Sequence, residues 1–349
     1  MDKAHEILAA ADTFYQDSLW SPEDGQSARE YLCGTRAIAI EVARVSGVGF
    51  LPAGEGGEPL VVALRRAGFS DDEILAAPVT RAAERRRPVD YPAGGGFITF
   101  PIRDADGQVT GFKYRAVPGV ARDDAPRYTG TSGDMLGAMF GWHLVSPTDE
   151  RLLVIEGEID QLSMETVRLS HPNLPRAVAW YGKELTDRRL HWFVARGVRH
   201  LTLALDADAG GWDGMLRSGR ELGRAGIAHE VLQLPAGLDP NAVLQAGGAA
   251  ILAHLVKHGP RPTLLEAHAQ VLSNSGVASV DPFFTARALR ETATATARQL
   301  TEAAYARAAG YVQLPVETLQ IALVEDVVVE PPARVRAASS TAPLTVGAA

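Results

Sequence analysis

The chain has 349 residues, a formal net charge of −8 and a single cysteine. Its length predicts two or three domains of ordinary size, and its 46% hydrophobic and 22% charged residues are typical of a soluble globular protein. The one cysteine, Cys33, excludes a disulfide within the chain and any structural zinc site that needs two or more cysteine ligands. We therefore expect no zinc cofactor.

The sequence also bears on where the protein works. No apolar run approaches the roughly 20 residues that span a bilayer. Residues 1–15 are typical of an amphipathic helix rather than of a signal peptide. We therefore expect a cytoplasmic protein without a membrane partner. The acidic net charge argues against a protein that coats nucleic acid, but it allows a local basic groove or a carboxylate-rich metal site.

The N-terminal part is predicted to combine helices with a hairpin. Residues 1 to about 90 are expected to be helical, because apolar residues recur near helical spacing, most clearly over 1–19 and 59–78. Two β-rich runs follow, Phe97–Ile102 and Val109–Val117, and an Asp-Gly turn lies between them. This pattern predicts an antiparallel hairpin.

Residues 151–257 alternate short apolar, β-branched runs with longer helical segments. Such alternation predicts βαβ units and a mainly parallel sheet flanked by helices, the α/β class, with ligands bound at the carboxyl ends of the strands. Helical pattern returns after residue 260, and the last 20 residues lack periodicity. The expected division is an N-terminal α+β subdomain with a basic groove (1–147), an α/β domain (148–258), a helical region (259–329) and a disordered tail (330–349).

Acidic residues follow three of the predicted strands. Glu156 and Asp160 come after the first, Asp206 and Asp208 after the third, and Asp239 after the fourth. Residues two apart in a strand face the same side, so Asp206 and Asp208 are expected to share a cleft with Glu156. Hard oxygen ligands that converge in this way suit Mg²⁺ or Mn²⁺, which also relieves their mutual repulsion. Each carboxylate taken alone is equally typical of a polar loop or a helix cap; their order and spacing favour the metal site.

These motifs resemble those of a known family. LLVIEGEIDQLSMETV (152–167) and LALDADAGGWDG (203–214) resemble the two Toprim motifs, and LPAGLDPNAVLQAGG (234–248) resembles the third acidic element of bacterial and phage primases. Upstream segments, including APRYTGTSGDMLGAMFG (125–141), follow the order of the catalytic core of DnaG-type primases. The resemblance covers roughly residues 8–257, with a looser match over 260–328. It implies a Rossmann-like Toprim sheet over 148–258 and synthesis of RNA primers on single-stranded DNA from nucleoside triphosphates.

The resemblance also implies roles for the acidic residues. Glu156 would act as general base or position the attacking 3′-hydroxyl. Asp206 and Asp208 would hold Mg²⁺ or Mn²⁺, and Asp160 and Asp239 would support that site. This assignment agrees with the chemistry, because phosphodiester formation needs metals at the attacking and leaving oxygens and a group that accepts a proton. Asn241 stands where cellular primases usually have a second Asp, which removes one negative charge from an outer metal site.

A basic strip precedes the α/β domain. Residues 80–128 contain nine Lys and Arg against six Asp and Glu, a net charge of +3, with six aromatic residues interleaved. A cationic surface with aromatics suits a single-stranded template and triphosphates, although a solvated surface over a hydrophobic hairpin gives the same pattern. In the resembling family, glycines stand at the places of Lys113 and Tyr114 and a lysine at that of Arg127. The candidate nucleic-acid or triphosphate contacts are Arg103, Lys113, Arg115, Arg127, Tyr128 and, after a later strand, Lys183.

Three functions remain open on the sequence alone. The favoured one is a primase. The alternatives are a Toprim metal-dependent nuclease or nucleic-acid processing protein of a mobile element or defence system, and a non-catalytic replication accessory module. The chain has no cysteine-rich zinc module of the kind that reads the template in the resembling family. We therefore expect one of two arrangements: a partner, either a replicative helicase or a separate template-recognition protein, supplies recognition of the starting site, or the enzyme starts with little sequence preference.

Overall fold

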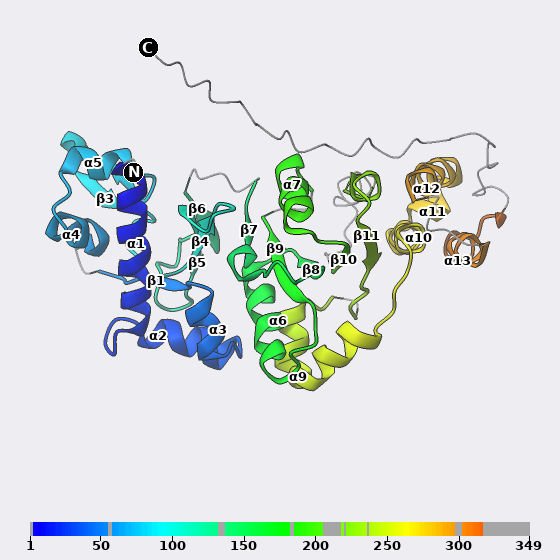
Figure 1. Ribbon diagram of the computed structural model, residues 1–349, viewed down its shortest axis with the longest axis horizontal. Helices are drawn as coiled ribbons and strands as arrows, with labels where there is room; N and C mark the ends of the chain where they lie inside the picture. The colour runs from blue at the N-terminus through cyan, green and yellow to red at the C-terminus, as the bar shows by residue number, and fades with distance from the viewer. Residues whose placement is uncertain are drawn as a thin grey trace, which may run out of the picture.

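The structure is a computed structural model that describes residues 3–54, 58–131, 137–181, 185–204, 218–219, 221–235, 237–296 and 302–316. Three regions follow one another along the long axis of the molecule: a mixed N-terminal part, an α/β domain and a group of helices (Figure 1). Within these described ranges, no helix has both the length and the apolar character needed to cross a membrane.

The N-terminal part packs helices against small antiparallel sheets. Its elements are α1 (Lys3–Trp20), α2 (Gln26–Arg29), the π-helical segment η1 (Glu30–Thr35), α3 (Ile40–Val45), β1 (Gly49–Leu51), α4 (Pro59–Arg66), α5 (Asp71–Ala76), β2 (Thr80–Ala82), the 3-10 turn η2 (Glu84–Arg86), β3 (Pro88–Asp90), β4 (Phe97–Arg103), β5 (Val109–Ala116) and β6 (Tyr128–Gly130). Helix α1 is amphipathic as expected: its buried face includes Ile7, Ala11, Tyr15 and Leu19.

The predicted hairpin is confirmed. Strands β4 and β5 pair antiparallel from Phe97 opposite Ala116, inside a four-stranded sheet of order β1-β4-β5-β6. Asp104 closes the turn by accepting N–H bonds from Asp106 and Gln108. The prediction of helix throughout residues 1–90 is wrong at β1, β2 and β3. Each of these strands has only three residues and is defined by its pairing partner, so no periodicity could reveal it.

The α/β domain matches the predicted alternation in the residues that the structure describes; the predicted helix between β10 and β11 lies largely outside them. Its elements are β7 (Met139–Phe140), the 3-10 turn η3 (Trp142–Leu144), β8 (Arg151–Ile155), α6 (Glu158–Ser170), β9 (Arg176–Trp180), α7 (Asp187–Arg196), β10 (His200–Leu203), β11 (Ala228–Val231) and α9 (Pro240–His258). The sheet order is β11-β10-β8-β9-β7, and every pair is parallel except β7 with β9. Helices α6 and α9 cover one face and α7 covers the other (Figure 1). The predicted α/β class is confirmed.

One hydrophobic core extends across both parts. It contains Ile98 and Phe100 from β4 together with Phe140, Val154 and Trp180 from the α/β sheet. The Phe100 and Phe140 rings meet edge to face with centroids 5.6 Å apart. The domain boundary predicted at residues 147/148 stays a prediction, because the chain on either side of it contributes to the same core.

The C-terminal helices have a core of their own. They are α10 (Leu264–Asn274), α11 (Val277–Val280), α12 (Pro282–Thr296) and α13 (Glu302–Val312). Leu265, Leu289 and Ala308 lie at the centre of this cluster with less than 1% exposure. The predicted helix toward residue 328 and the predicted tail over 330–349 lie outside the described residues.

A buried carboxylate anchors helix α4. Asp90 is 3% exposed and accepts N–H bonds from Leu60 (2.9 Å) and Val61 (2.8 Å), two of the amides that a helix start leaves without partners. Burial raises the pKa of Asp90 from 3.8 to about 6; the two N–H bonds oppose this shift and the charge of Glu58 adds to it. The folded protein therefore binds this proton more tightly than the unfolded chain does.

Asp90 should make stability depend on pH in a defined direction. Because its folded pKa is raised, its contribution is complete below about pH 4, falls as pH rises toward 6 and is constant above that, a loss of about 3 kcal/mol. Asp90→Asn has no such titration. Between pH 4 and 7 the free energy of unfolding should therefore fall less in this variant than in the wild type. Urea unfolding of both proteins at the two pH values measures this. An equal difference between them at both pH values would contradict the assignment.

Candidate active site

The turn from β8 into α6 sets the acidic edge of the sheet. Glu156 directly follows β8, and Gly157 has extended backbone before the helix. Asp160 lies in the first turn of α6, where the helix dipole stabilises a negative charge. A Cβ atom on Gly157 would lie 2.9 Å from Asp160 Oδ2. The glycine thus leaves room for the Asp160 carboxylate to fold back over the turn.

Asp160 connects the start of α6 to the start of α9. The backbone N–H of Asn241 donates to Asp160 Oδ1 at 3.0 Å, and Asp239 caps α9 by accepting from the N–H of Ala242 at 2.6 Å. Asp239 is thus a helix cap, one of the two roles that the sequence allowed for it. Asp206, Asp208 and Lys183 lie outside the described residues. Among the residues that are described, no three His, Cys, Asp or Glu side chains form a group able to hold a metal.

Lys113 connects the N-terminal sheet to this edge. Its Nζ donates to Glu158 Oε1 at 2.7 Å, so that β5 is tied to the first turn of α6. The Glu158 side chain is fully buried and that of Lys113 is 24% exposed. A carboxylate without solvent depends on its partner, because water cannot replace the lost charge pairing.

Aromatic rings enclose the Lys113–Glu158 pair. The Lys113 Nζ lies 4.8 Å from the centroid of the Tyr128 ring and 5.5 Å from that of Tyr181, within the range of a cation–π contact. Within the described structure, Glu158 Oε2 and the Tyr181 hydroxyl are buried without a hydrogen-bond partner. Burial and the charge of Glu158 raise the pKa of Tyr181 well above its usual value, so the phenol stays protonated at neutral pH.

Arg115 lies inside the protein between two tyrosines. Its side chain donates to the Tyr31 hydroxyl at 2.6 Å through Nε and to the Tyr128 hydroxyl through one terminal nitrogen, and the residue is only 3% exposed. It joins η1 to strands β5 and β6. Burial raises the pKa of Tyr128, and the neighbouring charge of Arg115 opposes that rise.

The other two arginines of the candidate set have different environments. Arg103 donates to Asp12 at 2.9 Å and to the carbonyl of Gly107, in a pair that is largely shielded from solvent. Arg127 is exposed, with its guanidinium 5.8 Å from the Tyr128 ring. Of the basic candidates that the structure describes, Lys113 and Arg127 are therefore the ones best placed to meet a ligand.

Asn241 joins the two parts of the core and is saturated with hydrogen bonds. It is 1% exposed; its amide donates to the Arg36 carbonyl (2.8 Å) and to Ser163 Oγ (2.9 Å), and its Oδ1 accepts from the Arg36 guanidinium (3.2 Å). The side chain thus binds η1 and α6, and its oxygen is directed at an arginine. The Asn241 amide therefore has structural partners on both sides.

Sequence reasoning did not single out Glu158, Tyr31 or Arg36. Glu158 had a readable signal, because it lies between the two acidic candidates Glu156 and Asp160. Tyr31 and Arg36 had none, because they meet their partners across 84 and 205 residues of chain.

Comparisons with known proteins agree with this geometry. Residues 14–136 match the family model described as DNA primase catalytic core, N-terminal domain, and residues 153–244 match Toprim-like. The DNA primase of Salmonella typhimurium is 28% identical over 273 residues, and that of Streptomyces coelicolor is 28% identical over 272. The RNA polymerase domain of Mycobacterium tuberculosis primase DnaG, in complex with a double-stranded DNA oligomer with a 6-nucleotide overhang, is 25% identical with a TM-score of 0.64.

The chain carries the catalytic core of a DnaG-type primase with a Toprim domain. Its alignments cover 75% and 76% of this chain but 44% and 40% of the Salmonella and Streptomyces primases, so the chain spans less than half the length of these relatives. The Mycobacterium match covers 90% of this chain and 98% of that one. Toprim primases use divalent metals in general.

The Lys113–Glu158 pair should behave as a coupled unit in stability. Lys113→Met leaves the buried Glu158 charge without its partner and should lower the free energy of unfolding by about 3 kcal/mol. Adding Glu158→Gln removes that stranded charge, so the double variant should regain much of the loss. Chemical unfolding of the wild type, both single variants and the double variant gives the coupling energy.

The exposed pair Lys3–Glu6 serves as the control, and Lys3→Met should leave the unfolding midpoint unchanged. If the effects of Lys113→Met and Glu158→Gln simply add, the pair does not couple the primase sheet to the Toprim helix.

Asn241→Asp tests whether the amide is required at this place. In the wild type, the Arg36 carbonyl accepts an N–H bond from the Asn241 amide. The variant keeps the size of the side chain but places a carboxylate oxygen against that carbonyl, which should lower the free energy of unfolding by about 1–3 kcal/mol. Thermal unfolding measures this, and the exposed Asn173→Asp provides a matched control. Equal melting temperatures for Asn241→Asp and the wild type would show that the amide donors are dispensable.

Proposed function

We propose that this primase core synthesises short RNA primers on single-stranded DNA from nucleoside triphosphates. The observation that carries the proposal is the ion pair between Lys113 and Glu158, which sets the basic, aromatic surface of β5 and β6 against the acidic turn of the Toprim domain. A polymerase needs both surfaces side by side: cationic groups for the phosphates and carboxylates for the reacting oxygens.

The acidic edge suits Mg²⁺ or Mn²⁺, because its donors are hard carboxylate oxygens. Glu156, Asp206 and Asp208 would hold the ion, with Asp160 and Asp239 in support. When bound, the metal stabilises the charge that develops on the attacking and leaving oxygens. Gly157 makes this arrangement possible, since any side chain there would displace the Asp160 carboxylate.

The chain's own residues supply the remaining tasks. Glu156 accepts the proton of the attacking 3′-hydroxyl or orients that group. Arg127 and the exposed edge of Lys113 bind phosphates, and the Tyr128 ring offers a face for a base. Arg103 and Arg115 act through the scaffold, because Asp12, Tyr31 and Tyr128 already occupy their guanidinium groups. Lys183 is a further candidate for the triphosphate.

The proposed function also implies a template and partners. The Mycobacterium domain was crystallised with DNA that carries a single-stranded overhang, which supports a single-stranded template here. We assign primer synthesis to residues 1–258, with the boundary between the N-terminal subdomain and the Toprim domain at 147/148. We propose that the protein acts in the cytoplasm. A replicative helicase or a separate template-recognition protein would select the starting site.

Primer synthesis on single-stranded DNA with Mg²⁺ or Mn²⁺ tests the proposal. Glu156→Gln and Asp206→Asn should each reduce primer yield by about 100- to 10,000-fold, because each removes a charge at the reacting oxygens. Glu291→Gln, the same kind of change on an exposed residue of α12, should leave the yield unchanged. Metal-dependent degradation of the template without primer synthesis would instead identify a Toprim nuclease.

A further inference from the structure

Two histidines form a pair on the outer side of helix α9. His254 and His258 are four residues apart, so they lie one above the other on the same face of the helix. Both are exposed, and their ring centroids are 4.9 Å apart with the ring planes inclined at 46°. Neither ring makes a hydrogen bond or an ion pair with another residue that the structure describes. The ring nitrogens are therefore available to a ligand.

The spacing of the two rings matches that of histidines that share a metal ion. In a tetrahedral zinc site, histidine nitrogens lie about 2.0–2.1 Å from the ion, which places the centres of two such rings about 5 Å apart. The observed separation of 4.9 Å agrees with this value, so rotation of the side chains suffices and the backbone stays in place. Histidines four apart on a helix also bind one Zn²⁺ in metalloproteases.

The electrostatics of this end of α9 favour a cation of modest affinity. His258 is the last residue of the helix, where carbonyl groups without helical partners carry a partial negative charge. Lys257 lies beside the pair and opposes a second cation, which limits the affinity. Imidazole nitrogens suit borderline ions such as Zn²⁺, whereas Mg²⁺ takes oxygen ligands.

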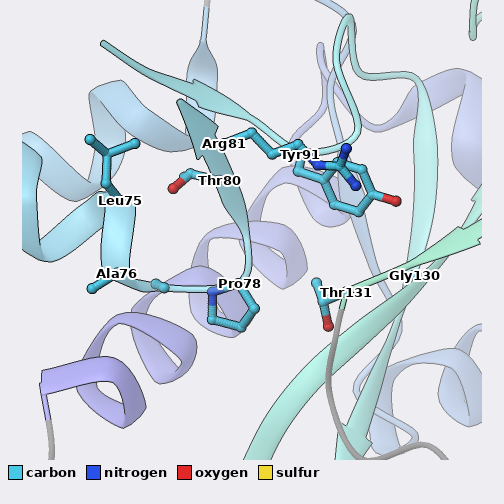
Figure 2. A pocket seen from close by; sticks show the side chains of 9 residues that line it. Leu75, Ala76, Pro78, Thr80, Arg81, Tyr91, Gly130 and Thr131 are labelled. Atoms are coloured by element: carbon cyan, nitrogen blue, oxygen red, sulfur yellow. The ribbon is translucent and has the colours of Figure 1, made fainter. Parts of the chain in front are cut away.

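The pocket on the N-terminal part has a different chemistry. It has a volume of about 410 Å³ and lies between the β2–β3 hairpin and β6, where the Arg81 guanidinium stacks on the Tyr91 ring (Figure 2). Its lining includes no His, Cys, Asp or Glu and therefore offers no usual metal ligand.

We propose that His254 and His258 form a binding site for Zn²⁺. Each ring supplies one nitrogen, and water completes the coordination. The site is not a cysteine-ligated structural site, which the single cysteine excludes and on which the expectation of no zinc rested. Because it has two protein ligands instead of four, its dissociation constant is on the order of 1–100 µM.

The histidine pair is separate from the acidic edge of the Toprim sheet. Helix α9 begins at that edge, where the Asn241 N–H donates to Asp160. The pair lies more than three turns further along, beyond the kink at Gly248, on the part of α9 that leads toward α10 (Figure 1). Zn²⁺ at the pair therefore leaves the carboxylates to Mg²⁺, and the inference does not depend on the proposed primer synthesis.

Isothermal titration with ZnCl₂ tests the site, using the full chain without a histidine tag and in the presence of excess Mg²⁺. His254→Gln and His258→Gln should each weaken Zn²⁺ binding at least about tenfold, because a single histidine cannot chelate. The double variant should bind no more weakly than either single variant. His191→Gln is the matched control, since His191 is exposed on α7 with no second histidine one turn away, and it should bind as the wild type does.

Two further measurements separate chelation from loose attraction to the surface. Lys257→Gln removes the neighbouring positive charge and should tighten Zn²⁺ binding about two- to fivefold. Zn²⁺ should raise the melting temperature of the wild type but not that of His254→Gln, because only the chelating site favours the folded state.

Equal Zn²⁺ affinity of His254→Gln and the wild type would overturn the proposal. A loss confined to one of the two histidine variants would do the same, because a chelate needs both nitrogens, and so would a wild type that takes up no Zn²⁺ at about 100 µM. Both side chains are exposed, so the glutamine variants should fold normally, and equal melting temperatures without zinc check this.

Discussion

The buried contact between Lys113 and Glu158 is the constraint on which the candidate site depends. It fixes a strand of the N-terminal sheet to the first turn of the Toprim helix, two residues after Glu156. Because Glu158 has no access to water, the pair resists separation more strongly than an exposed ion pair would. The basic and acidic halves of the site are therefore held in one position relative to each other.

Polar contacts on a second side repeat this linkage. The Asn241 side chain binds Arg36, the residue that follows η1, and the Ala39 N–H donates to Thr166 of α6. Beneath them, Phe100 and Phe140 belong to a single core. Asn241 thus takes part in the contact between the two parts.

Local pattern accounts for much of this fold. The βαβ alternation, the hairpin and helix α1 were predictable because their apolar periodicity is long or their turn residues are specific. The short strands β1, β2 and β3 were not, since each is defined by its neighbour. At the site, the place of Glu156 and Asp160 in the turn from β8 into α6 was predictable from the motif, while the metal site and the basic groove stay predictions. The burial of Arg115 and the pairing of Arg103 with Asp12 were not, because these contacts join residues far apart in the chain.

The shared core bears on how the enzyme would advance along its template. Opening the molecule between β4 and β7 would expose the Phe100 and Phe140 rings to water, at a cost of several kcal/mol by the usual value for burying large side chains. A hinge at this place is therefore unfavourable. Under the proposed function, the nucleic acid would therefore move over a fixed surface from one nucleotide to the next.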